Sequence, residues 1–283
     1  MSLNTINTNN TAIIALQSLN ATNAQLAATE KRISTGYRVA DATDDGAAYA
    51  VAQGVRSDVA SLTSANEQLG NAKGLLATTV SGLNDISNTL IAARTVLLKL
   101  SDSTVQGNER TQYTAQYQSL IANVKSFIQD ASYSGKTLIG NLSHSTGTFG
   151  GIGVVRNEVG ASYSVGSFSG SALYAAVNLT GTQLGAATTV GLQISATGGF
   201  TAEFNTLGGQ LSTYGASSKY IDNQVSYNND KVDALNSGLG ALIDADLTKE
   251  SARLQSLQTR QQLGTQALSI ANQASQSLLS LFK

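Results

Sequence analysis

The residues with the clearest chemical potential are two pairs of carboxylates and a single histidine. Asp44 and Asp45 are adjacent in ATDDGAA, Asp244 and Asp246 flank one alanine in IDADL, and His144 lies in NLSHSTG. Paired carboxylates can act as a general acid and a general base. Both pairs, however, directly precede segments with a helical pattern, where a carboxylate accepts hydrogen bonds from free backbone N–H groups. We therefore expect these pairs to cap helices rather than to catalyse a reaction.

No further motif completes an active site. One histidine cannot form the HExxH zinc motif, and the chain has no cysteine to act as a nucleophile or thiolate ligand. The run GGIGVVRN lacks the strand–GxGxxG–helix setting of a dinucleotide site, and no GxxxxGK[ST] phosphate loop occurs. The sequence thus predicts no catalytic residue, no metal site and no cofactor, and the protein is not expected to be an enzyme.

The charge content excludes several classes of partner. Only 12% of the 283 residues are charged and the net charge is −1, against about 25% charged residues in ordinary soluble proteins. No basic cluster indicates nucleic-acid binding, and no run of about 18 apolar residues indicates insertion into a membrane. The first residues also lack the basic segment and apolar core of a signal peptide. By that test alone the protein looks cytoplasmic, and leaving the cell would require a route without a cleaved signal.

Apolar residues near the N-terminus recur at coiled-coil spacing. Leu19, Leu26 and Ile33 lie seven residues apart, and Ile13 and Leu16 extend the same stripe by one turn. A seven-residue repeat of this kind places the apolar side chains on one helix face that seeks a partner helix. We therefore expect the first part of the chain to be a helix that pairs with another.

A longer heptad pattern follows in the next segment. Six leucines recur at strict seven-residue intervals, at Leu62, Leu69, Leu76, Leu83, Leu90 and Leu97. The chain contains no proline, which would break a helix interior at a cost of roughly 3 kcal/mol. After a break near residues 101–109, a further helix is expected from Tyr113 to about Gln129.

The middle of the chain differs in composition. Of the 27 glycines, 17 lie within residues 135–215, and only Arg156 and Glu158 are charged within residues 137–202. Runs such as GIGVVRN, ASYSVGSF and TTVGLQISATGGF alternate apolar and small polar residues between glycines, which is typical of short β-strands. A flexible linker would share the Ser/Thr/Gly content, but the interspersed Val, Ile, Phe and Tyr favour a small β-rich domain.

From about Tyr220 the helical pattern returns and continues to the end of the chain. NSGLG at residues 236–240 is expected to loosen the helix. Beyond it, apolar positions recur every three or four residues, at Leu263, Ala267, Ile270, Ala274, Leu278 and Leu281. A helix over residues 241–281 would be about 60 Å long, which is too long to bury itself in a compact domain. The two chain ends are therefore expected to pair with each other.

Both ends of the chain avoid charge. The first 29 residues and residues 261–282 contain no charged side chain. A lysine on a face buried against copies of the same chain would be desolvated beside its own repeats, which costs several kcal/mol. Gln, Asn, Ser and Thr can instead hydrogen-bond across such a contact. The pattern favours self-assembly through both termini over an ordinary helix pair in a monomer, and a heterologous contact of this kind can propagate as a helical polymer.

Two segments resemble the terminal signatures of bacterial flagellins. They are INTNNTAIIALQSLNATNAQLAATEKRISTGYRVADATDDGAAYAVAQGVRSDVASL near the front and DADLTKESARLQSLQTRQQLGTQALSIANQASQSLLSLFK at the end. The resemblance joins several separated motifs in the right order, and it leaves out the middle, as is usual in a family whose centre varies. It implies a structural subunit that polymerises into the flagellar filament and serves motility.

The resemblance also implies a layered organisation and a fold class. Residues 1–40 and 246–283 would form the filament core, with the paired terminal helices as an inner tube. Residues 41–134 and 216–245 would form the helical outer tube, and residues 135–215 a β-rich variable region that faces solvent. The fold expected is mainly α: a long antiparallel helical bundle or coiled coil built from both chain ends, with a small β-rich central variable domain.

Contact residues follow by correspondence with the family motifs. The expected filament-core interface comprises Ile6, Asn7, Ile13, Leu16, Leu19, Leu26, Ile33, Leu263, Gly264, Ala267, Leu268, Ile270, Ala271, Leu278 and Leu281. The spoke between the layers and the start of the outer tube would use Arg32, Arg38, Asp44, Asp45, Arg56 and Asp58.

Partners and location follow from the same resemblance. Flagellins are exported unfolded by the flagellar type III apparatus without signal cleavage, which would place this chain outside the cell in the filament. The implied partners are other copies or related flagellins, an export chaperone that binds the C-terminal region, and hook-associated and cap proteins. No nucleic acid and no membrane insertion are expected.

Two alternatives stay open from the residues alone. One is a hook–filament junction protein, which shares similar terminal helices. The other is a flagellin-like cell-surface protein whose central domain binds carbohydrate through the aromatic residues Tyr163, Phe168, Tyr174 and Phe200. These four side chains are at least as well explained as the core of a small domain.

Overall fold

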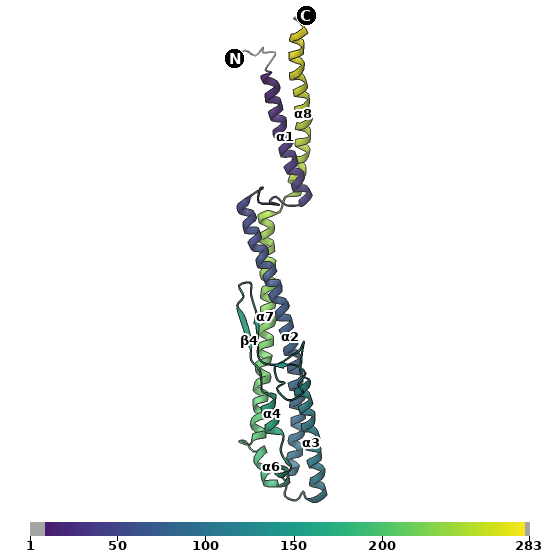
Figure 1. Cartoon of the computed structure of the whole chain (residues 1–283), viewed down its shortest axis with the longest axis vertical. Helices are drawn as coiled ribbons and strands as arrows, with labels where there is room; N and C mark the ends of the chain where they lie inside the picture. The colour runs from purple at the N-terminus through teal and green to yellow at the C-terminus, as the bar shows by residue number, and fades with distance from the viewer. Residues whose placement is uncertain (1–8, 281–283) are drawn as a thin grey trace. The chain divides into compact units, whose positions relative to one another are not determined.

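Helices dominate the protein. The computed structural model describes the backbone of residues 9–280 and the side chains of residues 9–273. In chain order the elements are α1 (Asn10–Thr35), α2 (Gly46–Leu100), α3 (Gly107–Asp130), β1 (Lys136–Thr137), β2 (Thr148–Phe149), β3 (Ile152–Val155), β4 (Ser162–Val165), α4 (Gly170–Val177), α5 (Gly181–Gly185), α6 (Ala187–Ile194), α7 (Gly199–Ile243) and α8 (Leu247–Ser280) (Figure 1). The predicted mainly helical fold with a small β region in the middle is confirmed.

The chain divides into two compact units. Unit 1 comprises residues 1–57 and 233–283, so it contains α1, α8 and the adjoining ends of α2 and α7. Unit 2 comprises residues 58–232 and contains the rest of α2 and α7 together with every element between them. Segments from the two ends of the sequence therefore meet in unit 1, where α1 and α8 pair as expected.

The core of unit 2 is built on the predicted leucine repeat. All six leucines are fully buried, at Leu62, Leu69, Leu76, Leu83, Leu90 and Leu97. The five from Leu69 to Leu97 share one hydrophobic cluster with a buried face of α3 and a second seven-residue repeat on α7, formed by Phe200, Leu207, Tyr214 and Ile221. The strict heptad spacing thus places three long helices side by side around a continuous seam, as coiled-coil packing requires.

The middle of the chain contains fewer strands and more helix than expected. The runs around residues 152–155 and 162–165 do form strands, which pair in an antiparallel hairpin with Ile152 opposite Val165. The prediction of strands in residues 188–200 is wrong, because α6 occupies residues 187–194 and α7 begins at Gly199. The returning helix therefore starts about twenty residues before Tyr220. Its first turns are rich in glycine, but the buried aromatic and leucine side chains of α7 outweigh the low helix propensity of glycine.

In unit 1, α1 and α8 pack against each other, and short connections join them to α2 and α7 (Figure 1). The expected loosening at residues 236–240 does not occur, since α7 continues to Ile243, and the break lies at residues 244–246 instead. There Asp246 caps α8 by accepting hydrogen bonds from the backbone N–H groups of Thr248 and Lys249 at 3.0 and 3.1 Å. Asp45 caps α2 in the same way through Ala47 and Ala48. The carboxylates first considered for catalysis thus include two helix caps.

Candidate assembly surface

The contact between α1 and α8 is a narrow seam of small and polar residues. The less exposed positions recur at three- and four-residue steps on both helices, and they are Ala12, Ala15, Leu19, Thr22, Leu26, Thr29 and Ile33 on α1 with Glu250, Leu254, Leu257, Gln261, Gly264, Leu268 and Ala271 on α8. Only Thr29, Glu250 and Leu257 of this set are buried. The seam therefore removes little apolar surface from water, and hydrophobic burial alone stabilises the pair weakly.

Side-chain amides supplement this seam. The Nδ2 atom of Asn9 donates to the carbonyl oxygen of Ala271 at 2.9 Å, and Nε2 of Gln261 donates to Oδ1 of Asn23 at 2.8 Å. Such neutral donors and acceptors fix the register of two helices without placing a charge at the contact. Their presence supports the reading that Gln and Asn replace charged residues where the ends of the chain are to be covered.

The predicted filament-core residues separate into two groups. Leu19, Leu26, Ile33, Gly264, Leu268 and Ala271 lie in the seam between α1 and α8. Ile13 and Leu16, which we expected to extend that seam, point away from it instead, and Ile13 is 56% exposed. The difference arises because the heptad places Ala12 and Ala15, not their neighbours, against α8.

Outside the seam, the same two helices carry apolar side chains that are exposed to solvent. They are Ile13, Ile14, Leu16, Leu263, Ala267 and Ile270, and we call them together the terminal surface. Ile270 is 67% exposed. Ile14 was not among the predicted contacts, although its position beside Ile13 in an apolar run could have identified it. Ile6, Asn7 and Leu281 lie outside the described residues, as does the side chain of Leu278.

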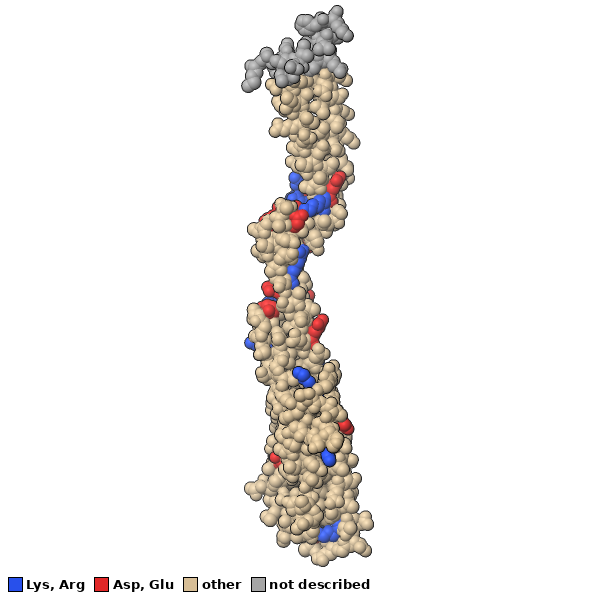
Figure 2. Space-filling model, viewed as in Figure 1, with Lys and Arg blue, Asp and Glu red and all other residues tan. Residues whose placement is uncertain are grey.

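The terminal surface is also free of charge. No charged residue occurs in α1 before Glu30 or in α8 between Arg260 and the end of the helix. On the face shown in Figure 2, the part of the α1–α8 pair near the chain ends carries neither acidic nor basic side chains. Large exposed apolar side chains on an uncharged background are typical of a surface that becomes buried against another molecule.

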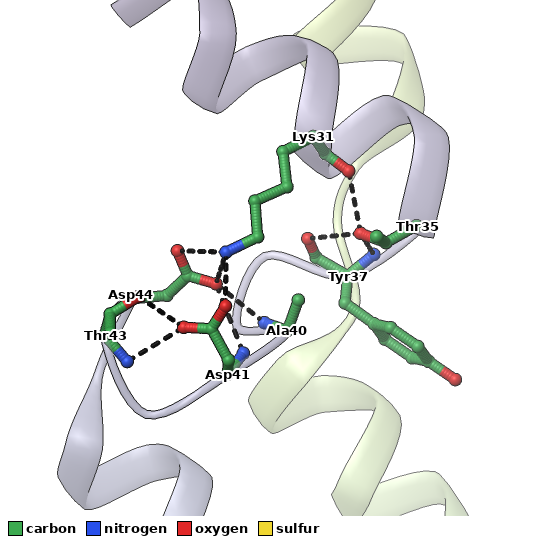
Figure 3. A network of polar contacts seen from close by, with 7 residues as sticks. All are labelled: Lys31, Thr35, Tyr37, Ala40, Asp41, Thr43 and Asp44. Atoms are coloured by element: carbon green, nitrogen blue, oxygen red, sulfur yellow. Dashed lines mark hydrogen bonds and ion pairs between the residues drawn. The ribbon is translucent and has the colours of Figure 1, made fainter. Parts of the chain in front are cut away.

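Charged residues gather where α1 ends. Helix α1 closes at Gly36, whose φ of 74° is the left-handed conformation that glycine adopts without strain. From the last turn of α1, Nζ of Lys31 reaches Oδ2 of Asp41 at 2.7 Å and Oδ2 of Asp44 at 2.9 Å (Figure 3). Oδ2 of Asp44 also accepts from the backbone N–H of Ala40 at 3.0 Å. These bonds hold the connection between α1 and α2 in one conformation.

The pKa values of this cluster follow from its geometry. The Lys31 ammonium lowers the pKa of both carboxyl groups, Asp41 and Asp44, and the backbone N–H groups that they accept from act in the same direction. The two carboxylates in turn raise the pKa of Lys31. Asp44 was predicted as a contact residue, whereas Lys31 and Asp41 were not identified. The DATDD segment does carry a signal for Asp41, because Asp and Asn commonly close local turns through their side chains.

The remaining spoke residues link the connections of unit 1. The backbone N–H of Arg38 donates to the carbonyl of Ile243 at 2.7 Å, and its guanidinium donates to the carbonyl of Leu242. Arg32 forms an ion pair with Glu250 at 3.4 Å. Arg32 therefore joins the end of α1 to the first turn of α8, and Arg38 joins the connection after α1 to the end of α7.

Two predicted residues further along α2 contribute differently. The guanidinium of Arg56 lies 5.9 Å from the ring centroid of Tyr37, which is within the range of a cation–π contact. Asp58 is exposed. Within the described part of the chain, no hydrogen bond or ion pair involves the Asp58 carboxylate.

The four aromatic residues considered for carbohydrate binding do not form one exposed surface. Phe200 begins the buried seven-residue repeat on α7 and is completely buried in the core of unit 2. The ring of Tyr163 stacks on Tyr220 with centroids 4.1 Å apart, and Phe168 and Tyr174 are half-buried against the same core. Their arrangement is that of core side chains, so it gives no support to an aromatic binding platform.

The described residues contain neither a candidate metal site nor a helix that could span a membrane. Residues 9–280 contain no cluster of three or more acidic, histidine or cysteine side chains that could hold a metal ion. No helix in that range is long and apolar enough to cross a membrane.

Comparison with known proteins covers most of the chain. Residues 6–143 match the bacterial flagellin N-terminal helical region, and residues 199–282 match the bacterial flagellin C-terminal helical region. Flagellin FljK of Caulobacter vibrioides is 34% identical over 283 residues and flagellin FljM of the same organism is 33% identical, with 100% of each chain covered. The flagellin of Brucella melitensis is 33% identical over 292 residues, with 98% of each chain covered. The second family match begins at Gly199, where α7 begins.

Proposed function

The chain belongs to the bacterial flagellin family and is a structural, non-enzymatic subunit of the flagellar filament, and we propose that the terminal surface is where its copies meet. The observation that carries this proposal is the combination of exposed isoleucine and leucine side chains with helices that bear no charge over the same stretch. Flagellins polymerise with copies of themselves, so this surface has a partner of matching chemistry in every neighbouring subunit.

The seam and the terminal surface have different roles in the proposed assembly. The seam between α1 and α8 uses Leu19, Leu26 and Leu268 to pair the two ends of one chain. The terminal surface then presents Ile13 and Ile270 to the next copy. Because the seam buries little area, each pair of helices gains most of its apolar burial on assembly. We propose that folding of the ends is completed by polymerisation.

We also propose a layered arrangement in the filament. Residues 1–40 and 246–283 would form the core, and residues 41–134 and 216–245 the helical layer around it. Only part of residues 135–215 would face solvent, because Phe200 and the other buried residues of the seven-residue repeat on α7 lie in the core of unit 2. The spoke cluster of Lys31, Asp41 and Asp44 would set the direction of the chain between the layers.

The route out of the cell and the auxiliary partners belong to the same proposal. The chain would be exported unfolded without a cleaved signal, held by a chaperone at its C-terminal region, and added to the filament under a cap protein. The low charge of residues 261–282 supports this, since a segment rich in Gln, Ser and Asn stays compatible with water before its apolar residues are covered.

Seeded elongation tests the proposal. Purified full-length chain is added to filament fragments, in parallel with a variant that lacks residues 261–283. The full-length chain is expected to elongate the seeds and the truncated chain is not. The thermal unfolding of unit 2 is the control, because it should be the same in both proteins. Equal elongation by the truncated chain, or no elongation by the full-length chain, would contradict the proposal.

A further inference from the structure

A pocket lies in unit 2 between α2 and the outer edge of β3. It has a volume of about 270 Å³, and we call it the edge pocket. Leu75 of α2 and Val154 of β3 line it with buried apolar side chains, while Tyr133 and Lys136 border it from the turn before β1. The pocket is slightly smaller than the roughly 300–1,000 Å³ of sites for drug-sized ligands, so it suits a short segment of a ligand.

The turn that forms one wall of the edge pocket is fixed. Tyr133 and Lys136 exchange backbone hydrogen bonds at 2.8 and 3.0 Å. Between them, Ser134 and Gly135 have φ values of 49° and 75°, and a type I′ turn requires positive φ at both of these positions. The ring of Tyr133 lies directly over Gly74 of α2, where an added Cβ atom would be 2.6 Å from Cζ of the tyrosine. This wall is therefore in place before any ligand binds.

Another wall of the edge pocket is the free edge of β3. The backbone N–H of Arg156 donates to the carbonyl of Ala161 at 2.8 Å, so these two facing residues form a hydrogen-bonded pair. Hydrogen-bonded pairs alternate with non-hydrogen-bonded pairs along antiparallel strands. Gly153, which faces Ser164 and lines the pocket, therefore turns its N–H and C=O away from β4. Within the described residues, no hydrogen bond from outside the hairpin reaches these two groups.

The hairpin is anchored beside α2 close to the edge pocket. Nδ2 of the buried Asn228 on α7 donates to the carbonyl of Arg156 at 3.0 Å and to Oδ1 of Asn66 on α2 at 2.8 Å. Asn66 lies two residues before Gln68, which lines the pocket. These bonds fix the strand edge relative to α2. A ligand that binds between them therefore loses little affinity to the ordering of the protein.

Polar side chains around the edge pocket are left without partners. Within the part of the chain that the structure describes, the amides of Gln68 and Asn71 form no hydrogen bond and the ammonium of Lys136 forms no ion pair. Among the described residues that line the pocket, Lys136 alone is charged. Lys73 of α2 is already paired with Asp222 at 2.6 Å. The pocket therefore offers one unpaired cation, two neutral amides and the backbone groups of a free strand edge.

We infer that the edge pocket binds the C-terminal end of an extended peptide from another protein, which adds a strand to the free edge of β3. The backbone of such a peptide supplies the acceptor and the donor that match the N–H and C=O of Gly153. Because the pocket is small, the peptide ends inside it, and its terminal carboxylate pairs with the unpaired ammonium of Lys136. An apolar last side chain lies on Leu75 and Val154. This site is separate from the terminal surface and goes beyond the proposed assembly.

An NMR titration of the unassembled full-length chain tests the site. The probe is a short peptide of one threonine and two valines, acetylated at its start and ending in a free carboxylate. We expect saturable binding that shifts the backbone amide resonance of Gly153. The same peptide ending in an amide, and acetate alone, should each bind at least about tenfold more weakly. Absence of binding by the free peptide, or equal binding by the amidated peptide or by acetate, would overturn the inference.

Two variants locate the contact on this chain. Lys136→Gln should weaken binding of the free peptide about tenfold, whereas Lys125→Gln, at an exposed lysine of α3 outside the pocket, should bind as the wild type does. Gly153→Pro removes the outward N–H and should abolish binding, and an edge strand tolerates proline where the N–H faces solvent. Wild-type binding by Lys136→Gln, or by folded Gly153→Pro, contradicts the inference, and Lys136→Gln decides alone if the proline variant unfolds. None of these measurements involves filament growth, so the proposed role of the terminal surface is tested separately.

Discussion

Gly264 of α8 faces Leu19 of α1 so closely that a Cβ atom added to the glycine would lie 3.2 Å from Cδ1 of the leucine. A glycine inside a helix costs roughly 1 kcal/mol relative to alanine, so its presence here has a packing reason. The glycine lets the two terminal helices approach, and that approach sets which side chains are left facing outward.

A bulky side chain at this position should therefore separate the terminal helices. Gly264→Val is expected to lower the dissociation temperature of filaments, whereas Gly264→Ala should have a small effect because the end of the Leu19 side chain can move. Adding Leu19→Ala to Gly264→Val restores the space and should recover part of the loss. If Gly264→Val filaments dissociate at the wild-type temperature, the close approach has no role in assembly.

The spoke cluster should titrate at both extremes of pH. The folded-state pKa of Asp44 lies below its ordinary value of 3.8. Its contribution to the stability of the folded state is therefore present above pH 3.8 and is lost as the pH falls through the folded-state pKa. The folded-state pKa of Lys31 lies above its ordinary value of 10.5. Its contribution to the stability of the folded state is therefore present below pH 10.5 and is lost as the pH rises through the folded-state pKa.

The backbone amide of Ala40 reports on this cluster, because it donates to Asp44. Its NMR resonance is expected to follow the protonation of Asp44, with a midpoint below 3.8. Replacing Lys31 with Gln removes the largest cause of the shift and should move that midpoint upward. An unchanged midpoint in Lys31→Gln would show that the ion pair does not hold the carboxylate.

The leucine seam of unit 2 should dominate the stability of that unit. Leu83 is completely buried, and Leu83→Ala is expected to reduce the free energy of unfolding by about 2–5 kcal/mol. The matched control is Ile91→Ala on the same helix, where the side chain is exposed and the change should stay within about 0.5 kcal/mol. Chemical denaturation monitored by circular dichroism measures both. Similar losses in the two variants would argue against the seam.

A buried amide interrupts the aromatic and aliphatic repeat on α7. Asn228 follows Ile221 by seven residues and is completely buried, and its Oδ1 atom accepts from Nε2 of Gln224 at 2.9 Å. Asn228→Leu leaves Asn66, Gln224 and the Arg156 carbonyl without this partner, and we expect a loss of about 1–3 kcal/mol. Asn229→Ala, at the exposed neighbouring position, should cost less. A Leu variant more stable than wild type would show that these groups find other partners.

Much of the fold could be predicted because its helices repeat with one period. The six leucines of α2 stand at seven-residue intervals in a segment with few glycines, and all six are buried as the spacing indicates. The corresponding repeat on α7 is hard to recognise in the sequence because it combines Phe200, Leu207 and Tyr214 with a glycine-rich segment. Burial against α2 and α3 decides the conformation there, and local propensity does not reveal it.

The assembly surface was predictable in its chemistry but only partly in its residues. The absence of charge from both ends pointed to a covered surface, and Leu263, Ala267 and Ile270 do form an exposed apolar face. The sequence pattern places Ile13 and Leu16 in the seam, because leucine and isoleucine normally mark the apolar face of a helix. At the start of α1, however, the seam uses Ala12 and Ala15. A seam of small residues is hard to distinguish from the outer face by sequence alone.

Seeded elongation by Ile270→Lys tests the central claim most directly. The substitution places one positive charge on the uncharged terminal surface without changing the seam, and burying that charge between copies should slow elongation by at least about tenfold. Leu192→Lys, which introduces the same charge at an equally exposed position of unit 2, should elongate at the wild-type rate. Elongation by Ile270→Lys at the wild-type rate would contradict the claim that the terminal surface is where the copies meet.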